Sequence, residues 1–176
     1  MNSASVRFRL IIWVGMLVGG MALGFALDPR WFPGLWRSLT FHLLTLPLGV
    51  VLLWFVLTVS RNTGRFLARL GREGDIPRME TNKLVTEGMY GCMRHPMHFG
   101  LLFFPLSVAL IVGSPTFIFF IAPLEMLFMV GMIKAFEEPE AIRKFGEAYR
   151  EYMRRVPMFS LRPQCLKKLL EPQPKG

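Results

Sequence analysis

Residues 87–100 hold the densest group of reactive side chains in the chain, with Arg94, His95 and His98 close together. Pro96 is suited to the first turn of a helix, because its missing N–H would have no partner there. The free N–H groups of such a turn, with the positive end of the helix dipole, make a site for a carboxylate or phosphate, which Arg94 and His95 would strengthen. The structural alternative is an arginine and a histidine at the level of the lipid headgroups, beside a proline that only starts a helix.

A second group, residues 136–140, carries Glu137, Glu138 and Glu140 where an apolar run ends. Carboxylates at a helix C-terminus oppose the helix dipole and lie unfavourably beside an anionic lipid leaflet. A binding site for the cationic amine of a ligand would offset this cost. Alternatively, Pro139 begins a new helix and places the carboxylates near its favourable N-terminus.

The composition indicates that membrane helices position these two groups. Of the 176 residues, 52% are hydrophobic and 19% are charged. A water-soluble domain of this size needs a larger polar share to cover its surface, so lipid must cover much of this protein. The net charge of +9 would suit a nucleic-acid-binding protein. The basic residues cluster where hydrophobic runs end, however, which is how charges orient a membrane protein. We therefore expect contact with membrane lipid and no nucleic-acid partner.

We predict a single all-α domain, an integral membrane bundle with four transmembrane helices over residues 10–27, 38–60, 97–112 and 116–135. The first run could instead be a signal peptide, but no small-residue cleavage site follows it. Gly113, Ser114 and Pro115 supply the turn of a tight helical hairpin. Glu125 is the only charged residue from Met97 to Ile133. Because a charge is costly at this depth, we expect Glu125 to face the bundle interior or to be protonated.

The polar segments carry most of the lysine and arginine, so the positive-inside rule places residues 80–100, residues 134–160 and both termini in the cytosol. Residues 143–155 repeat apolar side chains at helical spacing, which predicts a cytosolic amphipathic helix near the C-terminus. Cys92 and Cys165 show neither Cys-x-x-Cys nor Cys/His ligand spacing. We therefore expect two free thiols and no metal site.

Two ordered motifs resemble those of the isoprenylcysteine carboxyl methyltransferase family and its bacterial relatives, which include phospholipid N-methyltransferases. The first is the run LVTEGMY at residues 84–90, followed by Arg94, His95, Pro96 and Gly100. The second is Glu137 and Glu138, followed by Phe145, Gly146, Tyr149, Tyr152, Val156, Pro157 and Phe159. The resemblance covers residues 82–159, and two motifs in order are far more specific than either alone.

The resemblance implies a multi-pass enzyme, in a bacterial inner membrane or its equivalent, that uses S-adenosylmethionine to methylate a lipophilic or membrane-accessible acceptor. It implies that Asn82, Lys83, Leu84 and Val85 line the adenosine end of the donor. Around the methionine and sulfonium part it places Tyr90, His95, Pro96, Met97 and His98. Glu137 would bind the donor's ammonium group. The catalytic candidates are then Arg94 and His98, with His98 able to accept a proton from an amine acceptor.

Two positions depart from the family pattern. The family usually has a tyrosine where this chain has His98, and protonation of that histidine would change the charge beside a cationic donor. The isoprenylcysteine enzymes have an arginine just before the paired glutamates, where this chain has only Lys134 nearby. This second departure weakens the case for a prenylcysteine substrate. A phospholipid amine, a lipid carboxylate and a small thiol all stay open as acceptors.

Two other functions fit parts of the pattern. Membrane sterol reductases that use NADPH look similar around Arg-His-Pro, but they typically place an acidic residue after the glycine, where this chain has Leu101. A non-catalytic scaffold with the same fold would bind no cofactor at all. The sequence does not indicate an oligomeric state.

Overall fold

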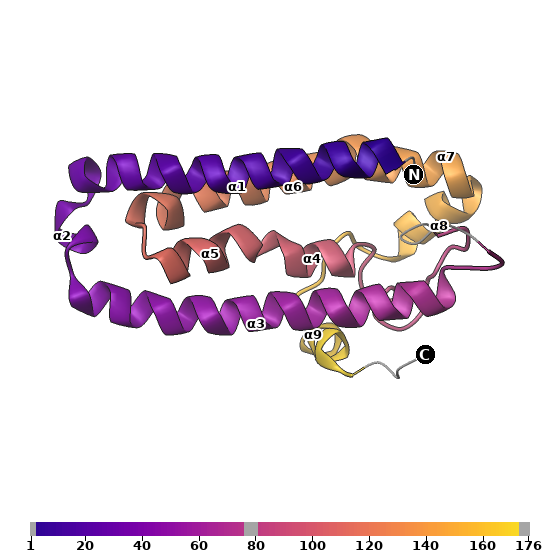
Figure 1. The fold of residues 1–176 in the computed structure, drawn as a ribbon. Coiled ribbons are helices and arrows are strands. Elements are labelled where there is room, and N and C mark those ends of the chain that lie inside the picture. Colours follow the sequence, from indigo (N-terminus) through magenta and orange to yellow (C-terminus); the bar gives the residue numbers. More distant parts are fainter. Residues whose placement is uncertain (1–2, 76–80, 173–176) are drawn as a thin grey trace. The chain divides into compact units, whose positions relative to one another are not determined.

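The computed structural model describes residues 3–75 and 81–172, and the regular secondary structure of these residues is helical (Figure 1). Three helices are long and apolar enough to cross a membrane, namely Ile11–Trp31, Leu39–Leu70 and Phe117–Phe145, and a shorter apolar helix covers Pro96–Val112. The predicted all-α membrane bundle is therefore confirmed. The helices that contain the second and fourth predicted spans continue well past the apolar runs.

Two compact units make up the chain, Met1–Trp54 with Phe103–Val130 and Phe55–Leu102 with Gly131–Gly176. The first unit contains α1 (Ser3–Trp31), α2 (Pro33–Trp36), α5 (Phe104–Val112), η1 (Phe117–Ile121) and most of α6 (Ala122–Met132). The second contains α4 (Pro96–Leu102), η2 (Ile133–Glu137), α7 (Glu138–Phe145), α8 (Glu147–Arg155) and α9 (Pro163–Leu170). Both units include part of α3 (Leu39–Leu70).

Small residues allow α1 to lie directly against η1 and α6 in the first unit (Figure 1). A Cβ added at Gly20 would lie 2.7 Å from the Oε1 atom of Glu125, and one added at Gly24 would lie 2.5 Å from the Oγ atom of Ser114. Such close approach is the usual reason for glycine on a membrane helix. Glu125 is only 4% exposed, which confirms that its side chain faces the protein interior.

An open groove of about 440 Å³ runs along this contact between α1 and α6. Its lining is apolar apart from Glu125 and consists of Gly15, Met16, Gly19, Gly20, Leu23, Ile121, Leu124, Glu125 and Phe128.

The predicted turn at residues 113–115 is confirmed and is held by a residue from α1. Gly113 ends α5 in the left-handed conformation, with φ of 70°, which glycine adopts without strain. The fully buried Asp28 accepts a hydrogen bond from the Thr116 N–H at 2.7 Å through its Oδ1 atom. Ser114 Oγ accepts a hydrogen bond from the Phe117 N–H at 3.2 Å. Together they cap the start of the last long helix.

Two π-helical turns widen that last helix, and each ends two residues before a proline, η1 before Pro123 and η2 before Pro139. A proline has no N–H, and its ring clashes with the carbonyl four residues earlier, which lies inside the wide turn in both cases. The helix then continues to Phe145. Glu137 and Glu138 therefore lie within a helix and not at its C-terminus, so the predicted conflict with the dipole does not arise. The alternative, in which a new α-helical segment begins around Pro139, agrees with α7, which starts at Glu138 directly after the π-helical turn η2.

The predicted amphipathic helix over residues 143–155 is wrong as one continuous element. Gly146 interrupts it with φ of 60° and ψ of −134°, which separates α7 from α8. This backbone conformation strongly favours glycine, because a side chain would be strained there. Because of this break, α8 takes its own direction after α7 and buries the side chains of Tyr149 and Tyr152.

The prediction of free thiols at Cys92 and Cys165 is also wrong, because the structure joins them in a disulfide. The fold brings their Cα atoms to 5.5 Å, within the range that a disulfide needs, although 73 positions separate them in the sequence. The bond ties α9 to the loop before α4. The α9 helix also lies against α3, where Asn62 Nδ2 donates a hydrogen bond of 2.9 Å to the carbonyl of the buried Leu169 (Figure 1).

Candidate functional site

Backbone hydrogen bonds hold the segment before α4 beside the segment that follows α8. The N–H of Arg94 donates to the carbonyl of Pro157 at 2.9 Å, and the N–H of His95 donates to that of Met158 at 3.3 Å. Pro96 starts α4, as predicted from its missing N–H. This arrangement fixes His95 at the beginning of the helix.

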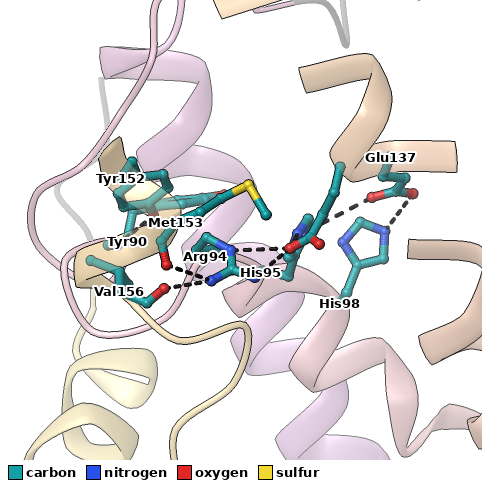
Figure 2. A network of polar contacts seen from close by, with 9 residues as sticks. Tyr90, Arg94, His95, His98, Glu137, Tyr152, Met153 and Val156 are labelled. Carbon is teal, nitrogen blue, oxygen red and sulfur yellow. Dashed lines mark hydrogen bonds and ion pairs between the residues drawn. The ribbon is translucent and has the colours of Figure 1, made fainter. Parts of the chain in front are cut away.

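Arg94 anchors the site through a nearly buried ion pair with Glu138. Its Nε and Nη2 atoms lie 3.0 and 2.5 Å from Glu138 Oε1, and the two side chains are 9% and 10% exposed. The Nη1 atom donates to the carbonyl of Val156 at 2.6 Å and to that of Met153 at 3.4 Å (Figure 2). The guanidinium thus joins α7 to the end of α8.

The two consecutive glutamates approach opposite nitrogen atoms of one imidazole. His95 Nδ1 lies 3.9 Å from Glu137 Oε2, and His95 Nε2 lies 3.5 Å from Glu138 Oε1. The side chain of His95 is 10% exposed. Nε2 is fully buried and makes no hydrogen bond within the described part of the chain.

His98 supplies the second imidazole of the cluster. Its Nε2 atom lies 3.0 Å from Glu137 Oε1, the distance of an N–H that donates to a carboxylate. The His95 and His98 rings stand edge to face with centroids 5.6 Å apart. Figure 2 shows the His98 ring and the Glu137 carboxylate pointing toward each other. Both side chains are more accessible than Arg94 and Glu138, at 22% and 24% exposed, so a ligand can reach them.

Burial lowers the pKa of His95 from its ordinary value of 6.5 to about 4. The neighbouring His98 lowers it further, whereas Glu137 and Glu138 act in the opposite direction. His95 is therefore a neutral imidazole at physiological pH.

This lowered pKa predicts a loss of stability in mild acid. The unfolded chain takes up a proton at His95 near pH 6.5, whereas the native protein does so only near pH 4. Between these values protonation favours the unfolded state. The free energy of unfolding is therefore unaffected by His95 above pH 6.5 and decreases as the pH falls toward 4. We expect His95 to account for about 2 kcal/mol of that loss by pH 5. Melting temperatures of purified protein from pH 7.5 to 5 should fall less steeply for His95→Gln than for the parent. Equal slopes would contradict the assignment.

Aromatic side chains lie on the Arg94 side of the site (Figure 2). The Tyr152 hydroxyl donates to the Tyr90 carbonyl at 2.5 Å, and the Tyr90 ring stacks on Phe66 with centroids 6.1 Å apart. Burial raises the pKa of Tyr149 to about 12, with a further contribution from Glu138, and burial also raises the pKa of Tyr90 and Tyr152. All three are neutral phenols at physiological pH. The site thus combines accessible histidine and carboxylate groups with aromatic rings.

Comparison with known proteins assigns a family to this arrangement. The profile of the phospholipid methyltransferase family matches residues 41–148, more than half of the chain. The chain belongs to this family. It is also 32% identical over 129 residues to the Arabidopsis thaliana protein named protein-S-isoprenylcysteine O-methyltransferase B, a match that covers 72% of the chain and 62% of that relative. The chain thus spans less than two thirds of the relative's length. No solved structure matches significantly.

The family assignment confirms the resemblance inferred from the two motifs, and with it a family of membrane methyltransferases that use S-adenosylmethionine. Of the site residues carried over from the resemblance, the structure brings Arg94, His95, His98 and Glu137 into one cluster. Their roles toward a donor stay predictions. Pro96 and Tyr90 are buried beside them, and Met97 is half-buried on α4.

The residues expected at the adenosine end lie in the second unit, in the loop between α3 and α4. The Asn82 side chain donates to the Glu73 carbonyl at 2.6 Å and accepts from the Glu73 N–H at 2.8 Å. The N–H groups of Asn82 and Lys83 both donate to the Gly71 carbonyl. Leu84 is half-buried and Val85 is buried. The segment therefore closes the loop at the end of α3, and its role toward a donor stays a prediction.

Sequence reasoning missed how Glu138 and Tyr152 serve the site. The sequence marks Glu138 only as part of an acidic group, yet it forms the ion pair with Arg94, 44 positions away. The amphipathic pattern over residues 143–155 predicts only an apolar face for Tyr152, yet its hydroxyl donates a hydrogen bond to the Tyr90 carbonyl. The family's second motif, in which Tyr149 and Tyr152 follow the paired glutamates, was the signal that could have indicated both contacts.

Proposed function

We propose that this chain transfers a methyl group from S-adenosylmethionine to a lipophilic acceptor. The observation that carries the proposal is the convergence of His95, His98 and Glu137, from two separate family motifs, into one accessible cluster. Membership of the phospholipid methyltransferase family supplies the reaction class.

The chemistry of the cluster fits the amino-acid end of the donor. Glu138 is already paired with Arg94 and nearly buried, so it is poorly placed to receive a ligand. Glu137 is the more exposed carboxylate of the pair, and we assign it the donor's ammonium group. The neutral rings of Tyr90 and Tyr152 suit the neighbourhood of a sulfonium, because aromatic faces attract cations.

The bound donor supplies an electrophilic methyl group, and the transfer is an in-line displacement that needs alignment and exclusion of water more than strong acid or base. We assign that alignment to the loop held by Arg94, whose guanidinium fixes the site against α7 and α8. An amine acceptor must lose a proton, and His98 is the accessible group that can take it. A carboxylate or thiolate acceptor needs no such base.

The acceptor is assigned by class only. The matched family is named for phospholipids and the plant relative for isoprenylcysteine, and both names describe lipophilic molecules. An acceptor of this kind would reach the site from the bilayer. We therefore expect the methylated product in the lipid phase.

We also propose that the site faces the cytosol, because the polar segments that form it carry most of the basic residues. The Cys92–Cys165 disulfide makes this placement important to test, since such bonds are rare in reducing compartments. A reporter fused after Gly176 should signal from the cytosol. A signal from the opposite side of the membrane would contradict the orientation.

Calorimetry on purified protein with EDTA present tests the donor directly. We expect saturable binding of S-adenosylhomocysteine, the demethylated form of the donor, and none of NADPH. Binding of NADPH alone would indicate a reductase, and binding of neither would indicate a scaffold. Membranes that contain the protein should also transfer labelled methyl from the donor to a lipid-soluble product, whose identification would name the acceptor.

A further inference from the structure

His95, His98 and Glu137 satisfy the geometry of a transition-metal site. One ligand atom from each side chain can be chosen so that all three lie within 4.8 Å of one another. Ligands around a tetrahedral Zn²⁺ lie about 3.3 Å apart, since metal–nitrogen distances are about 2.0–2.1 Å. Glu137 approaches His98 through Oε1 at 3.0 Å and His95 through Oε2 at 3.9 Å. Side-chain movements that draw the three groups together around one ion would complete the site.

The surroundings of His95 match those of a histidine that binds a metal. Such a histidine usually donates its second ring N–H to a carboxylate, which fixes its tautomer. If Nδ1 binds the metal, Nε2 faces Glu138 Oε1 at 3.5 Å, and Arg94 holds that carboxylate in place. In the structure Nε2 is a buried nitrogen without a hydrogen bond among the described residues, and a short movement of the ring toward Glu138 would supply one.

We propose that His95, His98 and Glu137 bind a divalent transition metal of the zinc type, and that metal and methyl donor exclude each other. Two imidazoles and one carboxylate favour Zn²⁺ or Co²⁺ over Mg²⁺ and Ca²⁺, which prefer oxygen ligands. Three protein ligands leave a fourth position for water. The exclusion rests on the proposed function, because it requires Glu137 to bind the donor's ammonium group. The metal site itself does not depend on that function.

His98 distinguishes this chain from the usual family pattern, since a tyrosine at this position cannot supply the second imidazole. The substitution His98→Tyr therefore removes one ligand while it restores the residue typical of the family. His42 is a suitable control, because its Nε2 atom lies 2.9 Å from the Trp36 carbonyl in the first unit.

The test uses tag-free protein, freed of metal with EDTA and kept oxidised so that Cys92 and Cys165 stay paired. Titration with Co²⁺ should give visible absorption bands that saturate at one metal per chain, and Zn²⁺ should displace it. We expect His98→Tyr and Glu137→Gln each to weaken Co²⁺ binding at least tenfold and His42→Gln to leave it unchanged. Absence of saturable binding in the parent, or equal affinity in His98→Tyr, would overturn the site.

Calorimetry with S-adenosylhomocysteine then tests the exclusion. Affinity measured in EDTA should fall at least tenfold when the protein is saturated with Zn²⁺. If Zn²⁺ binds and the affinity for S-adenosylhomocysteine does not change, the exclusion is wrong while the site stands. If S-adenosylhomocysteine fails to bind even in EDTA, the proposed function fails, and the Co²⁺ titration still decides the metal site.

Discussion

Arg94→Met should destabilise the protein by about 3–5 kcal/mol, because it leaves the Glu138 carboxylate nearly buried and without its cation. The carbonyl of Val156 loses its side-chain donor as well, so only the backbone bonds to Pro157 and Met158 still hold the loop before α4 to the segment after α8. For a chain of this size we expect the melting temperature of the purified protein to fall by about 10 °C. Donor binding should weaken in parallel, because the same loop carries His95.

Two controls separate this effect from loss of any surface charge. Arg150→Met removes a pair with Glu147 in which both side chains are more than half exposed, so its cost should stay within about 1 kcal/mol. Arg94→Lys keeps the charge but cannot reach Glu138 and the Val156 carbonyl together, and we expect an intermediate loss. A melting temperature for Arg94→Met that equals that of Arg150→Met would show that the ion pair does not hold the site.

Hydropathy predicts the membrane spans because residues in contact with lipid are apolar. It does not predict where a helix ends once the helix has left the lipid. The α3 helix continues past its apolar run to Leu70, through Arg61, Arg65 and Arg69 at intervals of four. Intrahelical hydrogen bonds do not require apolar side chains, so the helix need not end where the hydrophobic run ends. The same applies to the last helix, which carries Glu137 beyond the predicted end of its span.

Local sequence patterns could not predict contacts between segments that are distant in the sequence. The pairing of Cys92 with Cys165 and the cap that Asp28 provides for Thr116 depend on how helices meet in space. The family motifs were able to indicate that the two halves of the site belong together. They could not show which glutamate is held by Arg94 and which stays accessible, because that follows from the wide turn at η2 and the position of α7.

The second large effect is expected for Glu137→Gln, which should lower the affinity for the donor. A hydrogen bond to a charged group typically contributes about 1.5–3 kcal/mol, so the affinity for S-adenosylhomocysteine should fall by roughly ten- to a hundredfold. Glutamine keeps the size of the side chain and can still accept a hydrogen bond from His98. The change therefore removes charge with little change in packing. The melting temperature should stay close to that of the parent, unlike that of Arg94→Met.

Glu147→Gln is the matched control, because it makes the same chemical change on α8, where the side chain is 66% exposed and pairs only with surface arginines. Its affinity for S-adenosylhomocysteine should equal that of the parent in calorimetry with EDTA present, so that no metal competes for the site. A loss confined to Glu137→Gln would assign the ammonium group to that carboxylate. If both variants bind as the parent does, Glu137 does not hold the donor, and the carboxylate serves only to position His98 through their 3.0 Å contact.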